Sequence, residues 1–143
     1  MSYISLNKIH LHLKLKRKLA LFIGMGQYFG SRTFEWIMLE KLETNYRATL
    51  VATLDQGDEI SNDVLSFDTV NQTEEGYGVG DISFFEGELF DCLEWIQDNY
   101  NGNIHQFIKP EELKEIYTDL VKEGKLGRDL DEEEDDDWVY RNT

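Results

Sequence analysis

The 143-residue chain contains a single cysteine, Cys92, and this scarcity limits what can hold the fold together. One cysteine cannot form an internal disulfide, and no cysteine or histidine stands near Cys92 at the spacing of a zinc site. Cys92 lies in a segment with helical apolar spacing, so we expect a small core residue and not a nucleophile. The fold must rest on packing, for which 41% hydrophobic residues provide one core.

Long apolar runs are also missing. No run approaches the ~20 residues that a membrane-spanning helix needs. Lys14, Lys16, Arg17 and Lys18 interrupt the N-terminal apolar stretch that a signal peptide would require. We therefore expect a soluble, cytoplasmic protein with one domain, placed at residues 1–126.

The sequence has no familiar catalytic motif, since G-x-S-x-G, H-E-x-x-H and C-x-x-C are all missing. Residues 24–30 contain three glycines, but the third is one position late for a dinucleotide-binding loop, and no Lys-Ser/Thr pair follows. With 29 acidic residues a carboxylate pair could be drawn almost anywhere, so such a pair carries no information. We therefore predict a non-enzyme without catalytic residues, cofactor or metal site.

Basic residues are few, with 14 Lys and Arg against 29 Asp and Glu, and the net charge is −15. The excess of acidic residues is distributed unevenly along the chain. Residues 1–47 carry eight basic and three acidic side chains, whereas residues 48–143 carry six and 26. A field of this strength repels nucleic-acid phosphates and anionic membranes and attracts basic proteins. We therefore predict a basic protein surface as the partner, with no direct binding to nucleic acid or membrane.

Alternating apolar residues predict an antiparallel sheet of about four to five strands in the N-terminal half. The glycine-rich residues 24–30 predict a turn or bulge. The segment 33–43 also fits a helix, and we favour a strand because the Thr- and Val-rich segment that follows completes a hairpin. The expected strands cover residues 9–16, 19–23 (as an extension or a second strand), 33–43, 46–54 and 64–70.

Two amphipathic helices are predicted after the strands. Ser83 and Glu86 fit a capping box at the start of a helix over residues 84–100. The second helix opens at Lys109-Pro110 and ends before Gly124. Strands followed by helices predict an α+β domain in which both helices pack on one face of the sheet.

Acidic residues crowd the polar sides of both helices, where like charges three or four positions apart destabilise a helix by about 0.2–0.5 kcal/mol per pair. Carboxylates displayed on a rigid frame resemble a phosphate backbone, so a groove that binds phosphates can also bind them. The plain alternative is an ordinary acidic surface. The residues predicted to bind a partner here are Glu88, Asp91, Glu94, Trp95, Asp98, Glu112, Glu115 and Asp119.

Residues 127–143 are predicted to form an acidic, flexible tail, because eight of the nine residues from Asp129 to Asp137 are acidic. The tail has two interpretations, a solubilising segment or a charged segment that docks on a basic groove. A calcium loop fits poorly, since Glu134 stands where an EF-hand needs glycine. The tail residues predicted to bind a partner are Asp131, Glu132, Glu133, Glu134, Asp135, Asp136, Asp137 and Trp138.

The predicted first strand carries a basic face, for which three uses remain open. It could receive the acidic tail, bind an anionic ligand, or protect a sheet edge against aggregation. The residues of this face are His10, His12, Lys14, Lys16 and Lys18.

These features together predict a non-enzymatic, acidic protein-binding protein. The most concrete form is an inhibitor, immunity or counter-defence protein that mimics nucleic acid and occludes a basic, nucleic-acid-binding surface. One alternative is a small-ligand or ion-binding module with aromatic pocket walls such as Phe22, Trp36 and Phe84. Another is an accessory subunit of a larger assembly.

Overall fold

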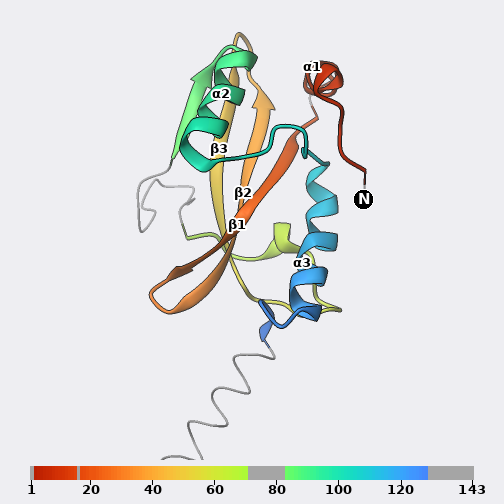
Figure 1. The fold of residues 1–143 in the computed structure, drawn as a ribbon, viewed down its shortest axis with the longest axis vertical. Helices are drawn as coiled ribbons and strands as arrows, with labels where there is room; N and C mark the ends of the chain where they lie inside the picture. The colour runs from red at the N-terminus through yellow and green to blue at the C-terminus, as the bar shows by residue number, and fades with distance from the viewer. Residues whose placement is uncertain (1, 16, 71–82, 129–143) are drawn as a thin grey trace, which may run out of the picture.

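A four-stranded antiparallel sheet forms the centre of the chain in the computed structural model, which describes residues 2–15, 17–70 and 83–128 (Figure 1). The strands follow one another across the sheet in the order of the sequence. Their bounds are Leu19–Tyr28 (β1), Ser31–Lys41 (β2), Tyr46–Leu54 (β3) and Phe84–Gly87 (β4). The predicted α+β class, with an antiparallel sheet followed by helices, is confirmed.

The glycine-rich stretch between β1 and β2 contains both a bulge and a turn. Phe22 pairs with Trp36 and Gly24 with Glu35, so one extra residue of β1 lies between these pairs. Phe29 and Gly30 have φ angles of 48° and 84°, the two positive values of a tight hairpin turn. The predicted turn or bulge is therefore present, but β1 does not end at residue 23 and continues through the bulge to Tyr28.

The predicted hairpin of 33–43 and 46–54 is confirmed as β2 and β3, which pair from Thr33 with Leu54 to Lys41 with Tyr46. The helix–strand ambiguity of the first segment has a physical cause. Both faces of β2 are buried at its centre, and so it lacks the polar–apolar alternation of a strand with one wet face.

Each face of the sheet carries its own hydrophobic cluster. On one face α1 (Ile9–Lys14) and α2 (Leu89–Tyr100) pack on residues such as Leu21, Ile37 and Ala48. On the other face α3 (Leu113–Lys122) and the 3-10 turn η2 (Val64–Ser66) pack on Phe34 and Trp36. The prediction that both long helices share one face is therefore wrong.

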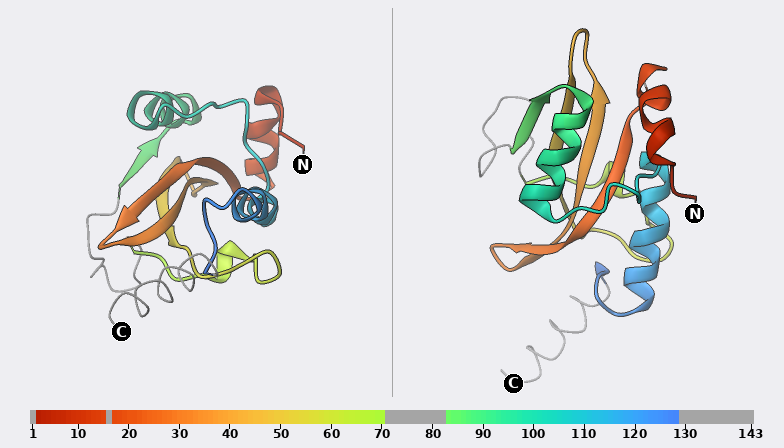
Figure 2. Two further views of the ribbon diagram at one scale, coloured as in Figure 1. Left: turned by 60° about the horizontal axis from the view of Figure 1, so that its bottom comes forward. Right: turned by 45° about the horizontal axis from the view of Figure 1, so that its top comes forward.

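The chain changes face at the edge of β1. Ala20 and Ile108 exchange two backbone hydrogen bonds of 2.8 Å, which draws the connection between α2 and α3 alongside the strand. This connection can be followed from α2 past α1 to the start of α3 (Figure 2, left). The residues after Ile108 then enter the cluster on the opposite face, a step that helix periodicity does not encode.

The predicted first strand over residues 9–16 is wrong, because Ile9–Lys14 forms α1, directly after the 3-10 turn η1 (Leu6–Lys8). Ile9 and Leu13 lie four positions apart on the buried side of this helix, whereas Leu11 and Leu15 are 52% and 61% exposed. Leucine and lysine favour helices, and Ile9 and Leu13 join the hydrophobic cluster on this face of the sheet.

The predicted start of the first long helix, at residue 84, is also wrong. Phe84–Gly87 pairs with β3 as β4, and α2 begins only at Leu89, with Glu88 as its N-cap. The Ser83 carbonyl accepts a hydrogen bond from the Leu50 amide at 2.9 Å. Pairing with β3 therefore overrides the local capping signal.

The predicted strand over 64–70 is wrong as well, since it forms η2 and contributes a single bridge between Thr53 and Thr69. The helix after Lys109 is confirmed, with a first turn of 3-10 geometry (η3, Pro110–Glu112) and Gly124 at a φ of 74° beyond its end. Residues 71–82 and the acidic run lie outside the described residues.

No helix in the described part of the chain combines the length and the apolar character needed to cross a membrane.

Candidate functional site

The candidate site is the acidic face of α2, which we define as Glu88, Asp91, Glu94 and Asp98. These residues lie three or four positions apart, so they follow one side of the helix, and all four are exposed. The buried side of the same helix carries Cys92 and Ile96, which are 0% exposed and pack against the sheet. The acids that the sequence analysis predicted on α2 therefore form one continuous row, and the opposite side of the helix packs against the sheet.

None of these four carboxylates forms an ion pair within the described residues. The ion pairs of that part of the chain lie elsewhere, for example between Arg47 and Glu86 on β3 and β4 and between Arg128 and Asp58. An acidic side chain with no internal partner keeps its full charge available for an external one.

The charge density of this row is close to that of one nucleic-acid strand. From Glu88 to Asp98 the helix advances about 15 Å at 1.5 Å per residue. Four carboxylates over that length amount to one charge per ~5 Å, compared with about 3.4 Å per phosphate along one DNA strand. A basic groove shaped for phosphates can therefore meet several of these carboxylates at once.

The location of Asp98 opposes the stability of α2 itself. Glu88 and Asp91 lie near the N-terminus of the helix, where the macrodipole favours negative charge. Asp98 lies in the last turn, which has no basic residue and where the dipole disfavours negative charge. Helix stability thus explains the first two acids and not the last.

We expect Asp98→Asn to raise the free energy of unfolding by about 0.5 kcal/mol, because it removes a negative charge from the C-terminal turn. Urea denaturation at low ionic strength measures this change. Asp91→Asn is the matched control, with the same chemical change at the other end of the helix and an expected loss of similar size. Shifts of the same sign in both variants would contradict the dipole argument.

The aromatic residue displayed beside this row is Phe90, not the predicted anchor Trp95. Trp95 is half-buried and packs against Phe85 and Tyr100, with ring centroids 6.2 Å and 5.2 Å away. Phe90 is 73% exposed and lies four positions before Glu94 on the same side of the helix. Phe90 is one of several apolar residues in the predicted helix over 84–100, and the sequence analysis did not identify it as exposed.

The predicted acids of α3 form a separate surface, because α3 packs into the cluster on the other face of the sheet. Glu115 and Asp119 are exposed there, whereas Glu112 is half-buried and one of its carboxylate oxygens has no hydrogen-bond partner in the described chain. The structure therefore does not join the acids of α2 and α3 into one site. The tail residues predicted to bind a partner, Asp131 to Trp138, lie outside the described residues. The segment considered above as a calcium loop also lies there.

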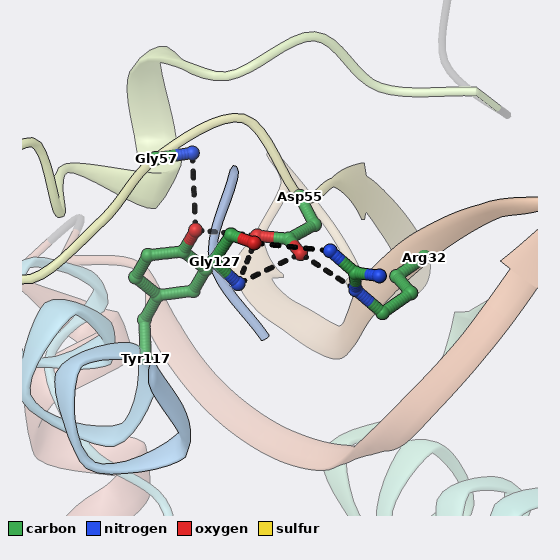
Figure 3. A network of polar contacts seen from close by, with 5 residues as sticks. All are labelled: Arg32, Asp55, Gly57, Tyr117 and Gly127. Carbon is green, nitrogen blue, oxygen red and sulfur yellow. Dashed lines mark hydrogen bonds and ion pairs between the residues drawn. The ribbon is translucent and has the colours of Figure 1, made fainter. Parts of the chain in front are cut away.

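A buried polar network connects the end of β3, α3 and the last described residues (Figure 3). The Asp55 side chain is 1% exposed and accepts hydrogen bonds from Arg32 Nε at 3.0 Å, from the Tyr117 hydroxyl, and from the Gly127 amide at 2.9 and 3.0 Å. The Tyr117 hydroxyl also accepts a hydrogen bond from the Gly57 amide at 3.0 Å. Arg32 donates to the Gly127 carbonyl at 3.0 Å. The polar groups satisfy one another, as buried ones must.

This network supports the structure, and its central carboxylate, Asp55, is almost fully buried. Burial and the hydrogen bond to Asp55 raise the pKa of Tyr117, so its hydroxyl stays protonated at neutral pH. Nearby, the Ser61 and Ile60 amides donate to Asp58 and lower the pKa of its carboxyl group. The sequence analysis missed this network, because its hydrogen-bonded members are separated by 23 to 95 residues.

Cys92 lies between α2 and the sheet, and burial raises the pKa of its thiol to about 11. The thiol is therefore protonated at neutral pH, which agrees with a core residue and not with a nucleophile. Among the described residues, no three His, Cys, Asp or Glu side chains lie together as a possible metal site.

The predicted basic strand face is wrong, because His10, His12 and Lys14 lie on α1 and Lys18 lies just before β1. His10 and His12 lie about 200° apart around the helix, His10 exposed and His12 half-buried. Lys14 lines an open depression with Lys41, whereas Lys18 lines another with Lys109. Lys16 is outside the described residues.

Two of the three predicted pocket-wall aromatics, Phe22 and Trp36, belong to the cluster beneath α3. Trp36 is 5% exposed, and its indole nitrogen donates to Thr53 Oγ1 at 3.2 Å. Phe84, on the edge strand β4, is 52% exposed and lies outside this cluster.

Comparisons of the chain with protein-family models, curated proteins and solved structures give no match.

Proposed function

We propose that this chain is a non-enzymatic protein-binding protein that occludes a basic surface of its target. The acidic face of α2 takes the place of a nucleic-acid strand in the target's phosphate-binding groove. The mechanism is occupation, so the protein acts as an inhibitor of the immunity or counter-defence type, in the cytoplasm. Charge complementarity speeds association, and the exposed Phe90 slows release by burying apolar surface.

The observation that carries the proposal is the row of four exposed carboxylates on α2, none of which has an internal ion-pair partner in the described chain. A surface shaped only for stability mixes charges of both signs. Here the row includes Asp98, which the helix dipole disfavours, so a use outside the folded chain accounts for it better than stability does.

The test uses the tagged intact protein and a variant carrying Asp91→Asn, Glu94→Gln and Asp98→Asn. A basic nucleic-acid-binding protein is captured from host lysate at low salt and purified, and its affinity for both forms is measured. We expect the variant to bind about tenfold more weakly, which corresponds to about 1.4 kcal/mol. We also expect the intact protein to displace a labelled DNA duplex from the target, with binding that weakens as salt rises.

The matched control carries Glu43→Gln, Glu59→Gln and Asp63→Asn. It has the same net charge change at three exposed sites with no ion pair in the described chain. We expect this control to bind the target nearly as well as the unchanged protein. Equal weakening by both variants would mean that only total charge matters, and binding that is independent of salt and of all three α2 acids would overturn the proposal.

A further inference from the structure

A second charged site lies where β1 begins, and its charge is positive. An open depression of about 440 Å³ is lined there by Arg17, Lys18, Lys109, Pro110 and Glu111. The backbone bridge between Ala20 and Ile108 creates it, because antiparallel pairing at that point brings the residues before β1 beside those that open α3. Segments some ninety positions apart thus place three cations around one depression.

None of these cations takes part in an ion pair in the described chain, although Glu111 lines the same depression. Arg17, Lys18 and Lys109 are exposed, and none forms an ion pair among the described residues. The three other described arginines each form an ion pair, namely Arg32 with Asp55, Arg47 with Glu86 and Arg128 with Asp58. The chain has 29 acidic and 14 basic residues, and among its described arginines Arg17 is the one without an ion pair.

We propose that this depression binds a small anion that carries phosphate groups. The guanidinium of Arg17 presents paired N–H donors that match two phosphate oxygens, and the lysine ammonium groups add charge around them. The carboxylate of Glu111 lines the same depression and opposes the anion. Glu111 therefore limits the affinity of the depression for the anion, and its neutralisation should raise that affinity.

The size of the ligand follows from the charge of the rest of the molecule. At physiological salt, charges interact over about 8 Å, so a small anion in the depression experiences mainly the local cations. A nucleic-acid chain or an anionic membrane extends past this range and meets the surface of a protein whose net charge is −15. The same cations therefore favour a small phosphate compound over a polyanionic surface.

The test is isothermal titration of the intact protein with inorganic pyrophosphate at 0.15 M salt. We expect saturable binding that weakens at least tenfold in the Arg17→Gln/Lys109→Gln variant. Lys41→Gln/Lys122→Gln is the matched control, with the same charge change at exposed sites away from the depression, and should bind as the unchanged protein does. Glu111→Gln should bind several-fold more tightly.

A parallel arm offers phosphatidylserine vesicles to the same four proteins, and we expect no association at this salt. Absence of saturable pyrophosphate binding would overturn the proposal, as would equal weakening by both double variants. Vesicle binding without pyrophosphate binding would overturn it in favour of a lipid headgroup. All substituted side chains are exposed, so urea denaturation should give nearly unchanged midpoints and confirm that the variants fold.

Discussion

Replacing Asp55 by alanine is expected to lower the free energy of unfolding by about 3–5 kcal/mol, the usual loss when one partner of a buried ion pair is removed. The substitution takes away the shared acceptor of the Arg32 guanidinium, the Tyr117 hydroxyl and the Gly127 amide. These donors lie at 17% side-chain exposure or are buried, so water replaces the lost acceptor poorly. Urea denaturation followed by tryptophan fluorescence measures the loss.

Asp63→Ala serves as the control, because Asp63 is exposed and its side chain makes no cap hydrogen bond to η2. We expect it to change stability by no more than about 0.5 kcal/mol. A double-mutant cycle with Arg32→Ala should give a coupling energy of about 0.5–3 kcal/mol. A loss at Asp55 no larger than that at Asp63 would show that the network contributes nothing to the folded state.

The network also fixes the position of Gly127 and Arg128, the two residues that precede the acidic run 129–137. Gly127 is held by Asp55 and Arg32, and Arg128 pairs with Asp58 at 2.7 Å while its amide donates to the Gly57 carbonyl at 2.7 Å. The residues just before 129–137 are therefore attached to the end of β3 and to α3. If the acidic run takes part in partner binding, the residue pair from which it starts is held in place by the buried contacts of Gly127.

The sheet was predictable where strands are long and pair with their sequence neighbours, as β2 and β3 do. The structure of residues 9–16 was not predictable, because the alternating apolar residues Ile9, Leu11, Leu13 and Leu15 fit both a strand and a short helix. In a strand all four apolar residues from Ile9 to Leu15 would face the core, whereas α1 buries only Ile9 and Leu13. The tertiary contact decides between the two, and it lies outside the local pattern.

The acids predicted on the first helix do lie exposed along α2, whereas the exposed aromatic residue beside them was not predicted. Phe90 stands two positions before Cys92, about 200° around the helix, and therefore points away from the core that Cys92 enters. The broad apolar stripe in the sequence concealed this direction. Pairing of Phe84–Gly87 with β3 likewise removed the first turn of the predicted helix, because four strand residues join the sheet there.

The polar sites that depend on distant segments had no sequence signal. Asp55 meets Tyr117 across 62 positions and Gly127 across 72, and the cations at Arg17 and Lys109 meet only because Ala20 pairs with Ile108. Each of these residues is an ordinary polar residue in its own neighbourhood. Their roles follow from the crossing of the chain at the edge of β1, which no periodicity predicts.

The pH dependence of stability should identify Tyr117 as a group that makes the fold sensitive to alkali, in addition to Cys92, whose thiol pKa burial raises to about 11. Burial, and next the hydrogen bond to Asp55, raise the pKa of Tyr117 in the folded state, whereas an unfolded tyrosine ionises near pH 10. The folded chain thus keeps a proton that the unfolded chain releases. This contribution to stability is complete below about pH 10 and declines as pH rises further.

Tyr117→Phe removes the hydroxyl group, and with it the ionisation that lowers stability at alkaline pH. At pH 7 we expect a loss of about 1–3 kcal/mol, because the Gly57 amide loses its acceptor and Asp55 loses a donor. Above pH 10 the difference between the two proteins should narrow, since only the unchanged protein still loses stability through this group. Urea denaturation at intervals from pH 7 to 11 measures the difference, with Tyr3→Phe, at a 51% exposed site, as the control. If the two curves stayed parallel over this range, the alkaline loss would have to come from another group.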